Sequence, residues 1–174
     1  MAKTATYSLI QSQTLSSSAA TVTFSSIPAT FTDLVLVGSA KSLLSGTDSI
    51  GIAVNGSGSA IYSRTYLEGN GSAVTTGRQT AQIRVVSDYI MGTTGTADFG
   101  TYTWNFMDYS NTTTKKTVLF RGNNTQVSGG WNASAMVYLV DTTSAITSLT
   151  IATMNGPNLA IGTTFKLYGI EAYK

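Results

Sequence analysis

The stretch from Ile27 to Val37 constrains the fold more than any other part of this chain. Pro28 fixes its own φ and cannot donate to a strand ladder, so it belongs just before a strand. The run from Leu34 to Val37 lacks polar alternation, which fits a strand that is buried on both faces. We therefore predict a central strand here, with the other strands packed around it.

The remaining sequence is typical of short strands separated by turns, because no apolar pattern with a 3.6-residue period extends over ten residues. The Asn-Gly pairs at 55–56 and 70–71 predict tight turns, since both residue types accept a positive φ. Residues 69–79 and 122–130 are predicted to be exposed loops. The predicted strands span residues 7–15, 20–24, 34–37, 50–54, 60–67, 81–86, 97–106, 117–121, 131–139, 146–153 and 165–173.

About ten short strands with little helix and no internal repeat predict an all-β fold. The arrangement that fits best is a two-sheet antiparallel sandwich of the jelly-roll type. The chain of 174 residues has the length of a single domain, so we expect one sandwich over residues 1–174.

Two of these strands carry patterns that predict their buried faces. Tyr102, Trp104 and Phe106 lie on one side of a strand and could form a ligand platform, an aromatic face of the core or a subunit contact. The last two interpretations are favoured because large rings dominate burial in sheets. Together with Trp131, these residues are the candidate partner contacts. In the strand at 131–139, the apolar odd-numbered residues from 133 to 139 predict the buried face.

Charge is sparse along the chain. Charged residues make up 10%, against about 25% in an average protein, and the formal net charge is +2. Such a surface offers no concentrated field, so we expect no nucleic-acid partner. Lys115 and Lys116 form the only adjacent basic pair, which we interpret as a solvated loop or strand end. No run reaches the roughly 18 apolar residues of a membrane span, and the N-terminal residues lack the apolar core of a signal peptide, so we expect no membrane partner and synthesis in a cytoplasm.

The chain contains neither histidine nor cysteine. This excludes Ser-His-Asp and Cys-His catalysis, as well as zinc sites built from imidazole or thiolate ligands. No glycine-rich phosphate-binding motif is present either. A glycosidase needs only two facing carboxylates, and Asp98 with Asp108 is the best such pair, although their spacing does not establish that they face each other. We therefore expect a protein that is not an enzyme and binds no cofactor.

Calcium is the metal that this composition leaves open, because calcium is bound by several oxygen ligands. Asp48 with Asn55, or Asp141 with Thr142, could contribute such ligands, yet the sequence contains no EF-hand pattern. We expect no metal site.

The residues from Tyr7 to Leu36, YSLIQSQTLSSSAATVTFSSIPATFTDLVL, resemble small virion proteins of tailed bacteriophages, cyanophages among them. The segment from Gly162 to Ile170, GTTFKLYGI, is similar to the same group, as are the turn regions at Asn55 and Asn70. Residues 85–135 carry no such likeness. The resemblance implies a structural role, because jelly-roll modules of such virion proteins serve as capsid decoration (cement) subunits or as parts of tail fibres.

We therefore expect a decoration protein on the outer capsid surface, made in the host cytoplasm, in contact with the major capsid protein and with copies of itself as a homotrimer. The alternative is a tail-fibre or receptor-binding module that contacts host-surface glycans. That alternative predicts a long fibrous shaft, and no coiled-coil or collagen-like stretch precedes Tyr7. A carbohydrate-active enzyme ranks third, since it needs convergent carboxylates.

Overall fold

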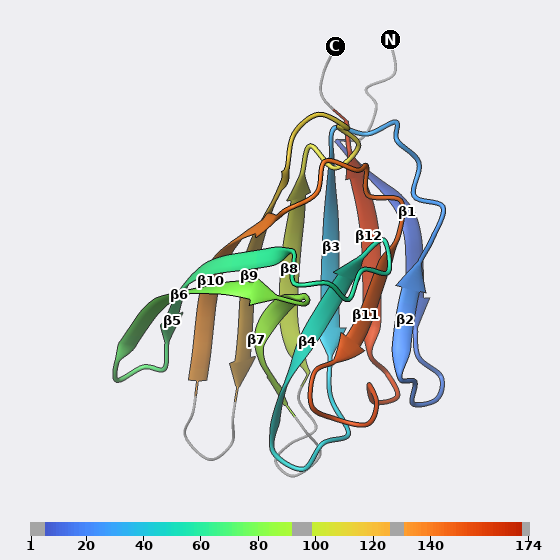
Figure 1. The fold of residues 1–174 in the computed structure, drawn as a ribbon. Coiled ribbons are helices and arrows are strands. Elements are labelled where there is room, and N and C mark those ends of the chain that lie inside the picture. Colours follow the sequence, from blue (N-terminus) through green and yellow to red (C-terminus); the bar gives the residue numbers. More distant parts are fainter. Residues whose placement is uncertain (1–5, 92–98, 126–130, 172–174) are drawn as a thin grey trace.

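The computed structural model describes residues 6–91, 99–125 and 131–171, which form twelve strands in two antiparallel sheets (Figure 1). These residues contain no helix, and hence none long and apolar enough to cross a membrane. In spatial order, the large sheet consists of β1 (Tyr7–Thr14), β12 (Thr164–Ile170), β3 (Asp33–Ala40), β8 (Gly100–Met107), β9 (Lys116–Thr125), β10 (Trp131–Val140), β5 (Tyr62–Gly69) and β6 (Val74–Gln82). The small sheet consists of β2 (Thr21–Phe24), β11 (Leu149–Thr153), β4 (Thr47–Val54) and β7 (Val85–Met91).

Eight of these strands have the jelly-roll topology, as the sequence predicts. The first pairs with the last, β1 with β12, and the pairs β2 with β11, β3 with β8 and β4 with β7 follow inward along the chain. Successive pairs alternate between the large and the small sheet, so the strand orders are β1-β12-β3-β8 and β2-β11-β4-β7. These two four-stranded sheets form the sandwich.

The other four strands are two hairpins inserted into that topology. The hairpin β5–β6 lies between β4 and β7 in sequence, and β9–β10 lies between β8 and β11. Because β9 pairs with β8 and β10 pairs with β5, the two hairpins extend the large sheet from four strands to eight. In Figure 1 they form the left side of the sheet, with β5 and β6 at its edge.

The predicted loops at 69–79 and 122–130 are therefore wrong in part, because β6 begins at Val74 and β9 continues to Thr125. The strand β6 is exposed along most of its length, so it lacks the apolar alternation that identifies a half-buried strand. The predicted Asn-Gly turn before it is confirmed: Gly71 has a φ of 83°, and Asn70 Oδ1 accepts hydrogen bonds from the backbone N–H groups of Ser72 (3.0 Å) and Ala73 (2.8 Å).

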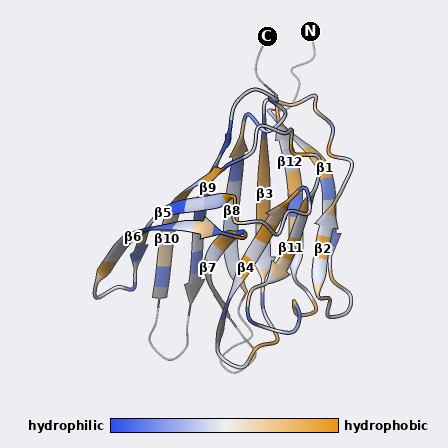
Figure 2. Cartoon of the chain, viewed as in Figure 1, coloured by the Kyte–Doolittle hydropathy of each residue, from blue (hydrophilic) through white to orange (hydrophobic). Residues whose placement is uncertain are grey.

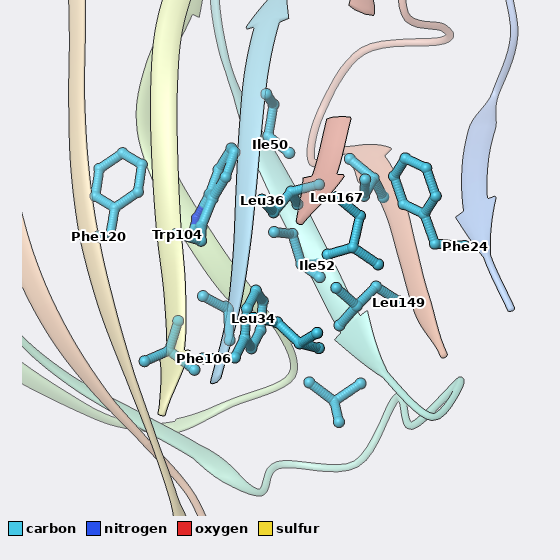
Figure 3. Close-up of a cluster of buried hydrophobic side chains, with 14 of the residues drawn as sticks. Phe24, Leu34, Leu36, Ile50, Ile52, Trp104, Phe106, Phe120, Leu149 and Leu167 are labelled. Carbon is cyan, nitrogen blue, oxygen red and sulfur yellow. The ribbon is translucent and has the colours of Figure 1, made fainter. Parts of the chain in front are cut away.

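One continuous hydrophobic cluster fills the space between the two sheets (Figure 3). The predicted central strand is confirmed: β3 lies between β12 and β8, and Leu34, Val35 and Leu36 are buried. Figure 2 shows this strand as one of the most hydrophobic segments of the molecule. Leu34 and Leu36 point inward toward the small sheet, where they pack with residues such as Ile52 and Leu149.

Lys116 is fully buried, so the interpretation of both lysines as solvated is wrong for this residue. Its ammonium group donates hydrogen bonds to the backbone carbonyl oxygens of Asn111 (2.5 Å), Thr114 (2.6 Å) and Thr143 (3.3 Å). These carbonyl groups take the place of the water molecules that the ammonium group loses on burial. Lys116 thus connects the loop between β8 and β9 with the loop after β10.

We predict that Lys116→Met lowers the free energy of unfolding by about 3 kcal/mol, because the three carbonyl groups lose their donor. Lys115→Met is the matched control. Lys115 pairs with Asp141 at 2.7 Å, but the two side chains are 54% and 58% exposed, so the expected loss is below about 1 kcal/mol. Urea unfolding measures both variants, and equal losses would contradict the role of Lys116.

Tyr138 links the inserted strands to the small sheet through hydrogen bonds. Its hydroxyl group donates to the carbonyl oxygen of Val86 on β7 (2.5 Å) and accepts a hydrogen bond from Arg64 Nη1 on β5 (3.2 Å). Arg64 also donates to Gln79 Oε1 on β6 (2.8 Å) and lies over the ring of Tyr66, 5.1 Å from its centre. Burial raises the pKa of the Tyr138 hydroxyl above its ordinary value of 10.0, although the charge of Arg64 lowers it in part.

A raised pKa in the folded state means that folding favours the neutral phenol. The stabilisation is fully present below about pH 10 and is lost as the pH rises through the folded pKa. We therefore predict that the free energy of unfolding falls in this alkaline range, and that it falls less steeply in Tyr138→Phe. Urea unfolding at pH 8 to 11, with tyrosinate absorbance as the monitor of ionisation, measures the difference; the same pH dependence in both proteins would rule out this contribution.

Candidate functional site

The aromatic residues proposed from the sequence as partner contacts belong to the core. Tyr102, Trp104 and Phe106 are 1%, 0% and 0% exposed, and all three belong to the core cluster on the inner side of β8. The ring of Phe120 on β9 lies 5.3 Å from that of Trp104 and 6.4 Å from that of Tyr102. Of the three interpretations that the sequence allows, the core is the one observed, and these side chains leave no surface for a partner. Trp131 begins β10, but its side chain lies outside the described residues.

The predicted buried face of β10 is also wrong. The odd-numbered residues point outward, with Val137 49% and Leu139 41% exposed, while the even-numbered Met136, Tyr138 and Val140 are buried. The inner face takes the larger side chains, and the hydroxyl of Tyr138 finds its partners there. Apolar alternation alone does not decide between two faces when both carry apolar residues.

The carboxylates proposed from the sequence do not form a site in the described part of the chain. Asp98 lies outside the described residues. Asp108 follows β8, and its backbone N–H donates to Asp33 Oδ1 at 2.6 Å. Within residues 6–91, 99–125 and 131–171, no three His, Cys, Asp or Glu side chains come close enough to hold a metal ion.

The two oxygen-ligand pairs considered for calcium have other partners. Asp48 and Asn55 lie at opposite ends of β4. Asp48 is buried, and its carboxylate accepts hydrogen bonds from the hydroxyl of Ser42 (2.7 Å) and the backbone N–H groups of Ser49 (2.7 Å) and Asn155 (2.9 Å). Asp141 pairs with Lys115. Asp48 therefore holds a turn beside β4, and its oxygen atoms are used by donors of the protein itself.

The largest unexplained surface is the side of the large sheet that faces away from the small sheet, which we call the outer face. Residues paired directly across neighbouring strands point to the same side, so the register orders this face into four rows that cross the strands. The first row, at the end of the sheet where both termini lie, holds Tyr7, Ile170, Asp33, Met107, Thr117, Leu139 and Ser63. The second row holds Leu9, Tyr168, Val35, Asn105, Leu119, Val137, Thr65 and Arg78. The third row holds Ser12, Lys166, Val37, Thr103, Arg121, Ala135, Leu67 and Thr76. The fourth row holds Thr14, Thr164, Ser39, Thr101, Asn123, Ala133, Gly69 and Val74.

Apolar side chains are concentrated in the first two rows, which we call the apolar band. They include the exposed Tyr7, Leu9, Leu119, Val137 and Leu139. Of the eleven exposed large hydrophobic side chains in the described residues, eight lie on the outer face. The fourth row carries mostly small and hydroxylated side chains, so the polarity of the face changes along the strands. Exposed apolar side chains gathered on one sheet face in this way mark an interaction surface.

Two shallow hollows lie in the outer face on either side of Leu119. One, of about 500 Å³, is lined by residues of β3, β8, β9 and β12, among them Asp33 and Met107. The other, of about 460 Å³, is lined by residues of β5, β6, β9 and β10, among them Leu67 and Val137. Broad hollows open to solvent enclose a small ligand poorly, whereas they accept side chains from another protein surface.

The outer face of the small sheet is different in character. Thr21 and Thr23 of β2 are exposed, and Thr150 of β11 is partly exposed and within 3.5 Å of Thr23 through their hydroxyl oxygens. Water can form hydrogen bonds with these hydroxyl groups, so this surface does not indicate a protein partner. The apolar band is therefore a property of the large sheet and not of the whole surface.

Compared with known proteins, the chain matches no family model, no curated protein and no solved structure. The fold and the chemistry of the outer face therefore carry the functional argument, together with the resemblance seen in the sequence.

We predict that outward residues of β10 can be made polar at little cost to folding, whereas their inward neighbours cannot. Val137→Thr should change the free energy of unfolding by less than about 0.5 kcal/mol, since Val137 is half exposed. Met136→Thr, one residue away on the buried face, should cost about 3 kcal/mol. Denaturant unfolding at low protein concentration measures both, and a larger loss for Val137→Thr would contradict the orientation of this strand.

Proposed function

We propose that this chain is a non-enzymatic structural protein of a tailed-bacteriophage particle, and that it decorates the outer surface of the capsid in contact with the major capsid protein. The outer face supports the structural, non-enzymatic part of this proposal, because it is a broad, shallow and charge-poor protein-docking surface rather than a catalytic cleft. A cement protein assembles through such surfaces, with the shell or with copies of itself.

The resemblance to virion proteins adds to this argument through its place in the fold. Residues 7–36 and 162–170 form β1, β2, the start of β3, and β12. The strands β1, β12 and β3 are direct neighbours in the large sheet, so the two distant segments build one continuous part of the sandwich. Jelly rolls recur in viral capsid proteins and in lectins, but a fold alone does not determine a function.

The sparse charge indicates how such attachment would work. With ten basic and eight acidic residues in 174, long-range electrostatic steering contributes little. Tight binding then depends on buried area and on repetition, because many subunits on one symmetric shell increase the effective affinity of each contact.

A receptor-binding module of a tail fibre is the second candidate, and a hollow of about 270 Å³ favours it. This hollow is lined largely by hydroxyl, amide and carboxylate side chains, which could form hydrogen bonds with the hydroxyl groups of a host glycan. Its lining residues are Val54, Asn55, Ser57, Ser59, Ile61, Asp141, Thr142 and Ser144. An aromatic ring for stacking on a sugar is absent from that lining, which ranks this candidate second.

Localisation in purified particles tests the proposal. We expect gold-labelled antibody, or density in a particle reconstruction, on the capsid surface, and we expect the protein to stay bound in about 1 M NaCl, where the Debye length is about 3 Å. Label confined to the tail would reject decoration and favour the fibre module, as would selective binding to a glycan array. Release at high salt would contradict attachment through neutral contacts.

A further inference from the structure

We propose that the outer face of the large sheet is the contact between two copies of this chain, which pack face to face about a two-fold axis running along the second row. The inference rests on the proposed function in one respect, since it takes the outer face to be a protein-docking surface. It names a second copy, and not the shell, as the partner at that surface, so the shell would contact the remaining surface of the pair.

The size of the face is sufficient for such a contact. Eight strands about 4.8 Å apart, with about seven residues of each strand across the four rows and a rise of about 3.3 Å per residue, give a face of about 900 Å². Three of its four rows, about 700 Å² from each copy, would be covered in the arrangement proposed. The resulting total exceeds the roughly 1,000 Å² that a specific interface needs.

The apolar side chains have the right place for an interface core. With the axis along the second row, Leu9, Leu119 and Val137 lie at the centre of the contact, and the hydroxylated fourth row lies at its rim. Two packed sheets interdigitate their side chains at a spacing of about 10 Å.

Under the same axis one pair of opposite charges comes within reach, while Arg78 of the second row lies opposite its own copy on the exposed edge strand β6. Asp33 lies in the first row, whereas Lys166 and Arg121 lie in the third row. A two-fold axis along the second row places the first row of one copy opposite the third row of the other. Asp33 then faces Val37, which is paired directly with Lys166 on the neighbouring strand β12. An exposed Lys166 side chain can reach across one strand to this carboxylate.

The two-fold pair differs from the trimer expected from the sequence. That expectation depended on the sparse charge and on surplus aromatic surface at Tyr102, Trp104, Phe106 and Trp131, and the structure places the first three of these residues in the core. The exposed apolar surface is instead on one flat sheet face. A face that contacts its own copy is isologous, and isologous contacts close as pairs.

Sedimentation equilibrium of the full chain between about 0.1 and 100 µM tests the pairing. We expect a dimer mass, and we expect Leu119→Asp and Val137→Asp each to raise the dissociation constant at least 100-fold. Ile161→Asp is the matched control, because Ile161 is 62% exposed but lies in the turn before β12, outside the outer face. Circular dichroism verifies that each variant keeps its β structure.

A double-mutant cycle tests the charge contact. Lys166→Gln and Asp33→Asn should each weaken pairing about 5-fold, and the asparagine keeps the acceptor for the backbone N–H of Asp108. If the two side chains meet, the double variant should be no weaker than the weaker single variant. Independent effects that multiply would reject the proposed axis.

The outcomes separate this inference from the proposed function. A monomer at 100 µM, a trimer mass, or equal weakening by Ile161→Asp would each overturn the two-fold pair. A monomeric protein that nevertheless labels the capsid would reject the pair, assign the outer face to the shell and leave the decoration function intact. A dimer that is lost in Leu119→Asp, from a protein found only on the tail, would support the pair and reject the decoration function.

Discussion

The register between neighbouring strands of the large sheet is the constraint on which both the core and the candidate site depend. Trp104, Phe120 and Leu36 point inward in one row because their strands pair in that register. The intervening residues must then point outward, Leu119 among them. A slip of one residue would exchange the two sets and expose the aromatic rings. The packing of the core therefore holds the apolar band in place, although the band itself contributes little to it.

The inserted hairpins explain why this protein has such a wide exposed face. An eight-stranded jelly roll would present only four strands on this side, whereas β9, β10, β5 and β6 double the width of the sheet. The small sheet covers the inner side only as far as its edge strand β7, which contacts β9 and β10. Arg64 and Tyr138 seal that boundary by joining β5, β6 and β7 through hydrogen bonds. The hairpins thus create docking area without a second core.

The composition of the strands made much of this fold predictable. It did not predict toward which side of a sheet single residues point. The buried run at Leu34 and the alternation at Tyr102 contain enough apolar residues to indicate strands whatever the tertiary context. β6 was not predicted, because this strand pairs through its backbone hydrogen bonds while most of its side chains are exposed. Such a strand has no apolar pattern in the sequence. The outer face of β10 was mistaken for its inner face because both are apolar. Lys116 looks identical to Lys115 in sequence, and only the loops around it show which lysine is buried.

The low charge of the chain has a physical consequence for how it can assemble. Surface charges normally keep apolar patches apart by their hydration and repulsion, and this outer face carries few. Lys166 and Arg121 stand in the third row, beside the apolar band, whereas Asp33 in the first row and Arg78 in the second row lie within it. Charge repulsion opposes association little, because the four rows hold only these four charged residues. Because apolar burial does not depend on a charge that salt can screen, an assembly built on this band would persist over a wide range of ionic strength.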